Sequence, residues 1–155
     1  MMVFLKEQYL IMMNTENKFK LGPIQKEWIR RLREHPERQT EGMLAAKVGD
    51  SYKACCLGEG LLTLCEANKI EPMWKTRFDS DTVYLHSVTP EDDEEYHVLK
   101  RNDFEGLGLR DQNGSFEEAL ENYACLTEMN DDGVSWSEIA DYIEQNPENV
   151  FVKSV

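Results

Sequence analysis

The sequence has few basic residues, and most of them lie in its first half. Across 155 residues there are 17 Lys and Arg against 30 Asp and Glu, which gives a formal net charge of −13. Residues 1–88 carry 13 basic and 12 acidic side chains, whereas residues 89–149 carry 3 basic and 18 acidic ones. A surface this acidic repels the phosphates of nucleic acids and favours solubility or a basic partner. We therefore expect no direct binding of nucleic acid.

Long hydrophobic runs are also missing. The apolar N-terminus is interrupted by Lys-Glu-Gln at residues 6–8, and no small-residue cleavage site follows, so we expect neither a signal peptide nor a membrane span. We expect a cytoplasmic protein. Residues 1–20 are expected to be poorly ordered or an extension, and residues 21–155 to form a single globular domain. Met13 is a second potential initiator, which leaves open whether residues 1–12 belong to the native product.

Recognisable metal and cofactor motifs are absent from the sequence. The four Cys lie at positions 55, 56, 65 and 125, and an adjacent pair cannot supply the two-residue gap of a zinc knuckle. No phosphate-binding glycine loop or dinucleotide fingerprint occurs. These absences predict a protein without a cofactor, and the cysteine pattern favours a reduced, intracellular environment.

The clearest signals that are present are two helix starts near the C-terminus. Ser115 and Ser135 are each followed three residues later by a glutamate, which is the spacing of a capping box. Apolar residues follow each serine at helical intervals. A cluster of turn residues at 130–133 separates the two segments, and Pro147 ends the second. The pattern predicts two amphipathic helices joined by a short turn, a capped C-terminal helical hairpin.

The turn of this hairpin partly matches a calcium-binding loop. Glu128, Asn130 and Asp132 occupy the first, third and fifth positions of an EF-hand-like pattern, with Gly133 at the sixth. The rest of the pattern fails, because Ser135 stands at position eight and the only downstream acid comes at position eleven instead of twelve. These three residues are weak candidates for a metal site, and a capped helix turn is the favoured interpretation.

Two more helices are predicted in the first half of the chain. Pro23 begins a basic helix that ends at Pro36, with Trp28 in its buried stripe. Its arginines either face solvent or dock against the acidic half of the domain. Residues 52–65 predict a buried helix, in which glycines at positions 58 and 60 indicate a tight crossing with another element.

Strand signals are fewer and shorter. Residues 43–51 predict a small hairpin or a strand-turn-helix junction. The runs at 82–88 and 96–99 alternate in polarity and predict a hairpin on either side of an acidic loop. Residues 102–113 are expected to form a loop, and residues 150–152 a short terminal strand. We therefore predict an α+β domain, with a small antiparallel sheet within residues 82–101 packed against about four helices.

Several of these segments together resemble a family of small uncharacterised proteins common in tailed phages and prophages. The likeness covers roughly residues 24–145 and implies a viral or mobile-element origin, with no activity to carry over. Two departures are a Glu-Gly pair at 59–60, where an apolar residue is usual, and Trp136, where Phe is common. The resemblance rests on Tyr52, Cys55-Cys56-Leu57-Gly58, Leu64-Cys65, Gly106-Leu107 and the segment from Leu126 through Asn130-Asp131-Asp132-Gly133 to Ser135-Trp136-Ser137-Glu138-Ile139-Ala140-Asp141-Tyr142-Ile143-Glu144.

Thiol chemistry is the enzymatic alternative. Cys55 or Cys56 near a helix N-terminus would have a lowered pKa, with His86 or His97 as a base and Asp103 or Asn113 as an orienting group. Nothing in the spacing enforces this arrangement, and buried cysteines are commonly small apolar core residues. Catalytic residues are therefore not assigned, and a small-ligand site near the cysteine pair remains the alternative function.

The favoured function is protein binding through an acidic surface, without catalysis. The expected partner is a basic host or viral protein, because carboxylates along the two hairpin helices would present a negative face to it. The residues expected to form this face are Glu117, Glu121 and Glu128 on the first helix, and Glu138, Asp141 and Glu144 on the second.

Overall fold

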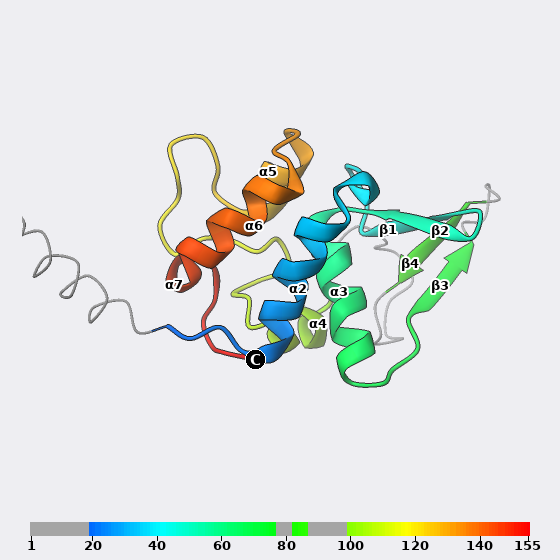
Figure 1. The fold of residues 1–155 in the computed structure, drawn as a ribbon, viewed down its shortest axis with the longest axis horizontal. Coiled ribbons are helices and arrows are strands. Elements are labelled where there is room, and N and C mark those ends of the chain that lie inside the picture. Colours follow the sequence, from blue (N-terminus) through cyan, green and yellow to red (C-terminus); the bar gives the residue numbers. More distant parts are fainter. Residues whose placement is uncertain (1–18, 77–81, 87–98) are drawn as a thin grey trace, which may run out of the picture.

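Three central helices and a four-stranded sheet make up most of the fold (Figure 1). The computed structural model describes residues 19–76, 82–86 and 99–155. Helix α2 (Pro23–Glu34) packs against both α3 (Cys56–Ala67) and α6 (Trp136–Gln145). The sheet lies beside α3, on the side away from α6. The predicted α+β class is confirmed, with six α-helices in the described residues instead of about four.

Helix α2 forms where the sequence predicts it. Pro23 stands in its first turn, and Trp28 and Leu32 are fully buried. The Trp28 indole N–H donates to the backbone oxygen of Cys56, which ties α2 to the start of α3. A backbone oxygen of Val155 accepts from two N–H groups in the first turn of α2, so the end of the chain caps this helix. The short 3₁₀ helix η1 (Pro36–Arg38) follows.

Helix α3 has the tight crossing that its glycines predict. The Cys55 side chain is the N-cap and accepts from the N–H of Gly58. A Cβ atom on Gly58 would lie 1.7 Å from the backbone oxygen of Leu44, and one on Gly60 would lie 2.9 Å from the Trp28 ring. Both glycines therefore allow neighbouring segments to approach the helix closely.

The sheet is antiparallel, with strand order β2-β1-β4-β3. Strands β1 (Ala45–Val48) and β2 (Ser51–Ala54) form a hairpin, one of the two outcomes expected for that segment. Strands β3 (Met73–Thr76) and β4 (Val83–His86) form a second, and β4 also pairs with β1. The prediction that confined the sheet to residues 82–101 was therefore wrong. The segment predicted as the partner of β4, residues 96–99, lies outside the described residues except for Leu99.

The prediction of a C-terminal helical hairpin is half correct. Helix α6 begins at the predicted cap, where the Ser135 hydroxyl accepts from the N–H of Glu138. The helix predicted to begin at Ser115 does not form there. Residues 115–125 are an irregular loop, and α5 is a short helix from Leu126 to Asp131. The Glu118 N–H, which a capping box would direct to Ser115, donates instead to Asn149 Oδ1 at 2.8 Å.

Two short helices form where the sequence predicted a loop and a terminal strand. Helix α4 (Arg101–Gly106) occupies the start of the segment predicted as a loop, and Asp103 accepts from the Lys100 N–H at its beginning. Pro147 ends α6 as predicted but also begins α7 (Pro147–Val150). Of the terminal strand predicted at 150–152, only an isolated antiparallel bridge between Phe151 and Leu109 forms. No helix in the described part of the chain has both the length and the apolar character needed to cross a membrane.

Candidate functional site

The Cys-Cys-Leu-Gly segment at 55–58 and the segment that begins at Leu126 meet at Asn130, the last but one residue of α5. Its side chain is fully buried. Oδ1 accepts from the Cys56 N–H and from the Trp136 indole N–H, each at 3.0 Å, while Nδ2 donates to the backbone oxygen of Thr40 at 2.7 Å. Gln39 Nε2 also donates to Oδ1, at 3.3 Å. Asn130 therefore joins the starts of α3 and α6 from inside the protein.

In this position Asn130 cannot serve as the calcium ligand that the loop pattern suggested. Its oxygen is directed at buried N–H donors, Glu128 accepts from the backbone N–H of Ala124, and Asp132 accepts from the Tyr123 hydroxyl. In the residues that the structure describes, no group of three or more His, Cys, Asp or Glu side chains is arranged to hold a metal ion.

The thiol hypothesis depends on Cys55 and Cys56, and both side chains are buried. Burial raises the pKa of Cys55 to about 11 and raises the pKa of Cys56 well above its ordinary value. Such thiols stay protonated and unreactive near neutral pH. Of the proposed bases, His86 ends strand β4 but its side chain is not described, and His97 lies outside the described residues.

We expect a soluble thiol reagent to modify neither Cys55 nor Cys56 in the folded protein at about pH 8, where exposed cysteines react. All four thiols should react after unfolding in denaturant. Because the folded-state pKa of Cys55 lies above its ordinary 9.0, its contribution to stability is complete below about pH 9 and is lost as the pH rises towards 11. Rapid stoichiometric labelling of either native thiol would contradict this expectation.

The six carboxylates expected to bind a partner do not form one face. Glu117 and Glu121 lie on the loop at 115–125, so their expected place on a helix with Glu128 was wrong. Asp141 and Glu144 are engaged by Arg33 of α2, at 2.8 and 2.9 Å. The basic helix therefore docks part of its charge on the acidic half, and the remaining residue of the set, Glu138, caps α6 with Ser135.

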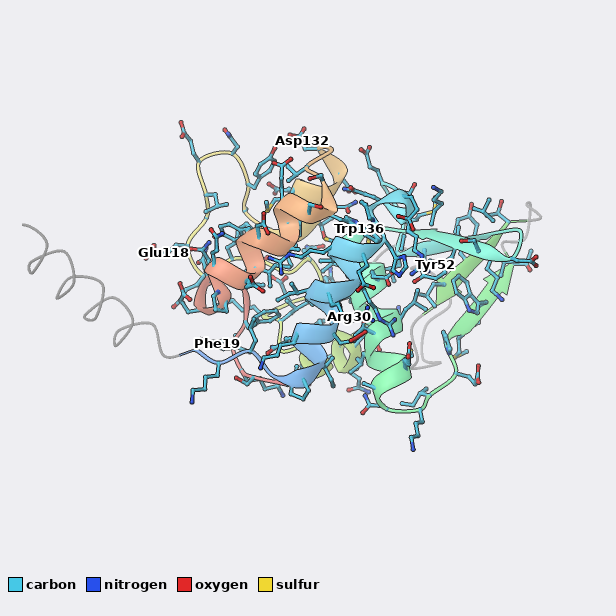
Figure 2. The ribbon with its side chains drawn as sticks, viewed as in Figure 1. Phe19, Arg30, Tyr52, Glu118, Asp132 and Trp136 are labelled. Carbon is cyan, nitrogen blue, oxygen red and sulfur yellow. The ribbon has the colours of Figure 1, made fainter. Side chains whose placement is uncertain are left out.

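Two acidic hollows remain at opposite ends of this region, and Figure 2 labels one residue of each, Asp132 and Glu118. The α5 hollow, of about 580 Å³, contains Glu128, Asp131 and Asp132. The α7 hollow, of about 430 Å³, contains Glu117, Glu118 and Glu148. Neither has a Lys or Arg among its described lining residues. All six carboxylates are solvent exposed, and Glu117 has Arg110 as an ion-pair partner at 3.4 Å. Hollows of this kind suit lysine and arginine side chains of another protein.

One charged cluster was missed by the sequence analysis. Glu59 of α3 is fully buried and accepts from the Tyr52 hydroxyl, at 2.7 Å to the nearer oxygen. Arg38 donates to the same hydroxyl at 2.8 Å and lies 3.6 Å from Glu59. Burial and the Glu59 carboxylate raise the pKa of Tyr52, so the phenol remains a donor. The available signal for this cluster was Glu59 itself, a single charged residue within the otherwise uncharged run at residues 54–65.

Comparison with protein-family models, curated proteins and solved structures finds no significant match to this chain.

Proposed function

We propose that the chain is a non-enzymatic accessory protein, of phage or prophage origin as its resemblance implies, that acts by binding a basic host or viral protein. The observation that carries the proposal is the pair of acidic hollows beside the loop at 115–125, each lined by three carboxylates. Lysine and arginine side chains of the partner would enter the hollows and replace water at these carboxylates.

Charge arrangement supports binding at the hollows more than along α6. Asp141 and Glu144 already have a cationic partner in Arg33, and pairing them elsewhere would break those contacts. The carboxylates of the α5 hollow accept from neutral donors, such as the Tyr123 hydroxyl on Asp132, so their negative charge is available to a cation. Long-range attraction by this surface would speed encounter with a basic protein and would weaken as salt rises.

A thiol-dependent enzyme is the weaker alternative. Cys55 acts as a helix cap and Cys56 is enclosed in the core, with its sulfur 3.8 Å from the backbone oxygen of Leu126. A substrate would have to displace core side chains to reach either sulfur.

Removing charge from the hollows should strongly reduce partner retention. In the hollow variant, Glu118→Gln, Glu128→Gln, Asp132→Asn and Glu148→Gln replace two carboxylates in each hollow by amides of similar shape. Each exposed ion pair contributes about 0.5 kcal/mol, so four lost pairs should weaken binding about thirtyfold. Immobilised protein incubated with host lysate at low and high salt, with retained proteins quantified by mass spectrometry, measures the effect.

The control variant carries Glu37→Gln, Asp50→Asn, Glu71→Gln and Glu105→Gln, which remove the same number of charges outside the hollows. We expect basic proteins that bind wild type and the control at low salt, dissociate at high salt and are strongly depleted on the hollow variant. Equal recovery on the two variants, or recovery that does not change with salt, would remove the basis of the proposal.

A further inference from the structure

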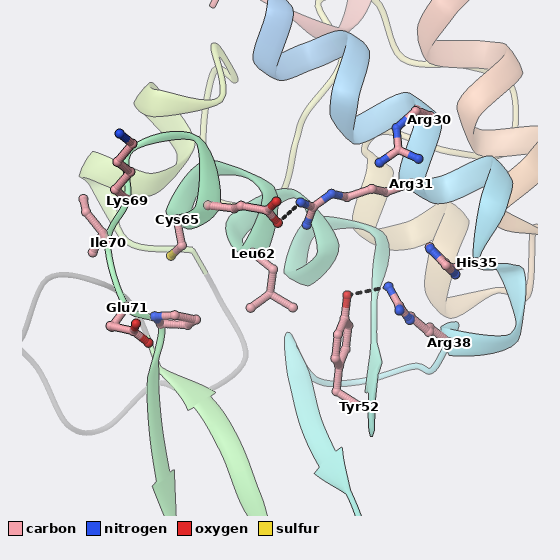
Figure 3. A pocket seen from close by; sticks show the side chains of 12 residues that line it. Arg30, Arg31, His35, Arg38, Tyr52, Leu62, Cys65, Lys69, Ile70 and Glu71 are labelled. Carbon is pink, nitrogen blue, oxygen red and sulfur yellow. Dashed lines mark hydrogen bonds and ion pairs between the residues drawn. The ribbon is translucent and has the colours of Figure 1, made fainter. Parts of the chain in front are cut away.

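A cavity of about 660 Å³ lies between α2, the end of α3 and strand β2, away from the acidic hollows (Figure 3). This volume is within the range of small-molecule sites. Its cationic side comes mainly from α2 and η1, which contribute Arg30, Arg31 and Arg38, and Lys69 lines the cavity after α3. Arg30 is already paired with Glu27 and Glu34 of its own helix. Its apolar side comes from α3 and the segment after it, which contribute Leu62 and Ile70. The cavity therefore combines a positive wall with an apolar wall.

Arg38 is held in place before any ligand arrives. Its guanidinium donates to the Tyr52 hydroxyl and lies 4.6 Å from the centre of the Tyr52 ring. Tyr52 in turn donates to the fully buried Glu59. Since the positions of all three groups are coupled, little conformational freedom of Arg38 is left to lose on binding. Figure 3 shows Arg38 and Tyr52 joined along the same rim of the cavity.

Arg31 is bound by a carboxylate that a ligand can replace. The Arg31 side chain is only 12% exposed. Its Nε lies 3.4 Å from Glu27 of α2, and its Nη2 pairs with Glu66, whose side chain is 74% exposed. The pair joins α2 to the last turn of α3 across the cavity, as the dashed line in Figure 3 marks. An exposed ion-pair partner contributes little stability, so exchange of the Glu66 carboxylate for another anion costs little. Glu66 thus marks where an oxyanion fits against Arg31.

We propose that this cavity binds a small amphipathic oxyanion, a carboxylate or phosphate attached to a compact apolar body. The anion takes the place of the Glu66 carboxylate on Arg31, with Arg38 as the second cation, because a planar guanidinium pairs with either group through two parallel hydrogen bonds. This site is independent of the acidic hollows, and failure of one proposal leaves the other standing.

The apolar wall sets the second requirement on the ligand. Ile70 is 47% exposed although it is a large hydrophobic residue, and Leu62 and Pro72 lie beside it in the cavity lining. Covering this surface with a ring or short alkyl chain removes apolar area from water, which an inorganic anion cannot do. Glu71 also lines the cavity and, with Glu66, disfavours a ligand of high negative charge. A compact ligand with one anionic group fits both walls best.

Four probes test the two requirements separately in amide-correlation NMR titrations of the full chain. Phenyl phosphate and benzoate each combine a ring with an oxyanion, inorganic phosphate lacks the ring, and benzyl alcohol lacks the charge. We expect the two aromatic anions to shift the amide signals of Tyr52 and Leu62 and to bind about tenfold more tightly than either incomplete probe. A preference for phenyl phosphate assigns the phosphate ester, and a preference for benzoate assigns the carboxylate.

Paired variants then test the site itself. Arg31→Gln should weaken binding of the preferred probe about tenfold, because it removes a charge-assisted pair. Glu66→Gln should tighten it severalfold, because the competing carboxylate is gone. The matched controls are Arg33→Gln and Glu144→Gln, which change the same charges in an ion pair of α2 outside the cavity and should leave affinity unchanged.

The opposite effects of Arg31→Gln and Glu66→Gln keep the test decisive if one variant folds poorly. The proposal is overturned if none of the probes binds at millimolar concentration, or if benzyl alcohol or inorganic phosphate binds as tightly as the aromatic anions. It is also overturned if Glu66→Gln and Glu144→Gln alter affinity equally, since the effect would then be one of net charge alone.

Discussion

Replacement of Asn130 by alanine is expected to lower the free energy of unfolding by about 3 to 5 kcal/mol, a large part of the stability of a domain this size. The variant deprives the Cys56 N–H and the Trp136 indole N–H of the oxygen that accepts from both. It also leaves the Thr40 carbonyl without its donor. Alanine is too small to fill the space, and each buried polar group without a partner costs about 1 to 3 kcal/mol.

Denaturant unfolding followed by tryptophan fluorescence measures this loss, because Trp28 and Trp136 are both fully buried. Asn122→Ala is the matched control, since Asn122 is exposed, and it should change stability by less than about 0.5 kcal/mol. Equal stability of the Asn122 and Asn130 variants would show that the buried amide is not the junction between α3 and α6.

A double-mutant cycle separates the Trp136 contact from the rest. Trp136→Phe removes the indole donor but leaves Asn130 bound to Cys56 and Thr40. The combined variant should be more stable than the sum of the single changes predicts, because the indole N–H orphaned by Asn130→Ala is then absent. Additive effects would contradict direct coupling between the two side chains.

The sequence predicted the elements whose signals lie within a few residues of one another. The Ser135 cap needs only the N–H of Glu138 three positions on, and Pro23 begins α2 with no help from distant parts of the chain. The buried glycine-containing helix α3 was predicted for the same reason. Local hydrogen bonds and helical periodicity are encoded in short stretches of sequence, so inspection of the sequence finds them.

The failures arose where a distant residue changes the outcome. Ser115 has the same spacing to a glutamate as Ser135, but the Glu118 N–H donates to Asn149, 31 residues away. The pairing of β1 with β4 likewise joins strands that are separated along the sequence by β2, α3 and β3. No local pattern distinguishes such cases, because the competing partner is brought in by the fold.

The candidate sites likewise have features that the sequence predicts and features that depend on tertiary packing. The acidic character of the C-terminal half could be predicted from composition, and the exposed carboxylates of the hollows follow from it. Composition could not predict which of these acids remain available to a partner. Arg33 reaches Asp141 and Glu144 only because α2 packs on α6. The arginine-lined cavity was missed because α2, β2 and α3 each supply part of it.

The glycine that ends the Cys-Cys-Leu-Gly run, Gly58, provides the second large expected effect. Gly58→Ala should lower the free energy of unfolding by about 3 kcal/mol or more, or prevent folding. The added Cβ would lie 1.7 Å from the backbone oxygen and 2.5 Å from the backbone carbon of Leu44. Backbone atoms cannot rotate away, and the same Leu44 oxygen accepts from the Cys55 N–H at 3.0 Å. Relief of the overlap therefore requires α3 to move away from Leu44, the residue before β1, and to break that hydrogen bond.

Gly60→Ala, two residues further along α3, is the matched comparison. Both glycines lie inside the helix, so alanine contributes about 1 kcal/mol of helix propensity at each. At Gly60 the nearest atoms belong to the Trp28 and Leu107 side chains, at 2.9 and 3.1 Å, and small rotations can relieve the contact. Its net loss should stay below about 2 kcal/mol in the same denaturant measurement. Because both variants gain the same helix propensity, the difference between their free energies of unfolding reports the backbone contact at Leu44. A Gly58 variant as stable as the Gly60 variant would mean that α3 does not approach Leu44 so closely.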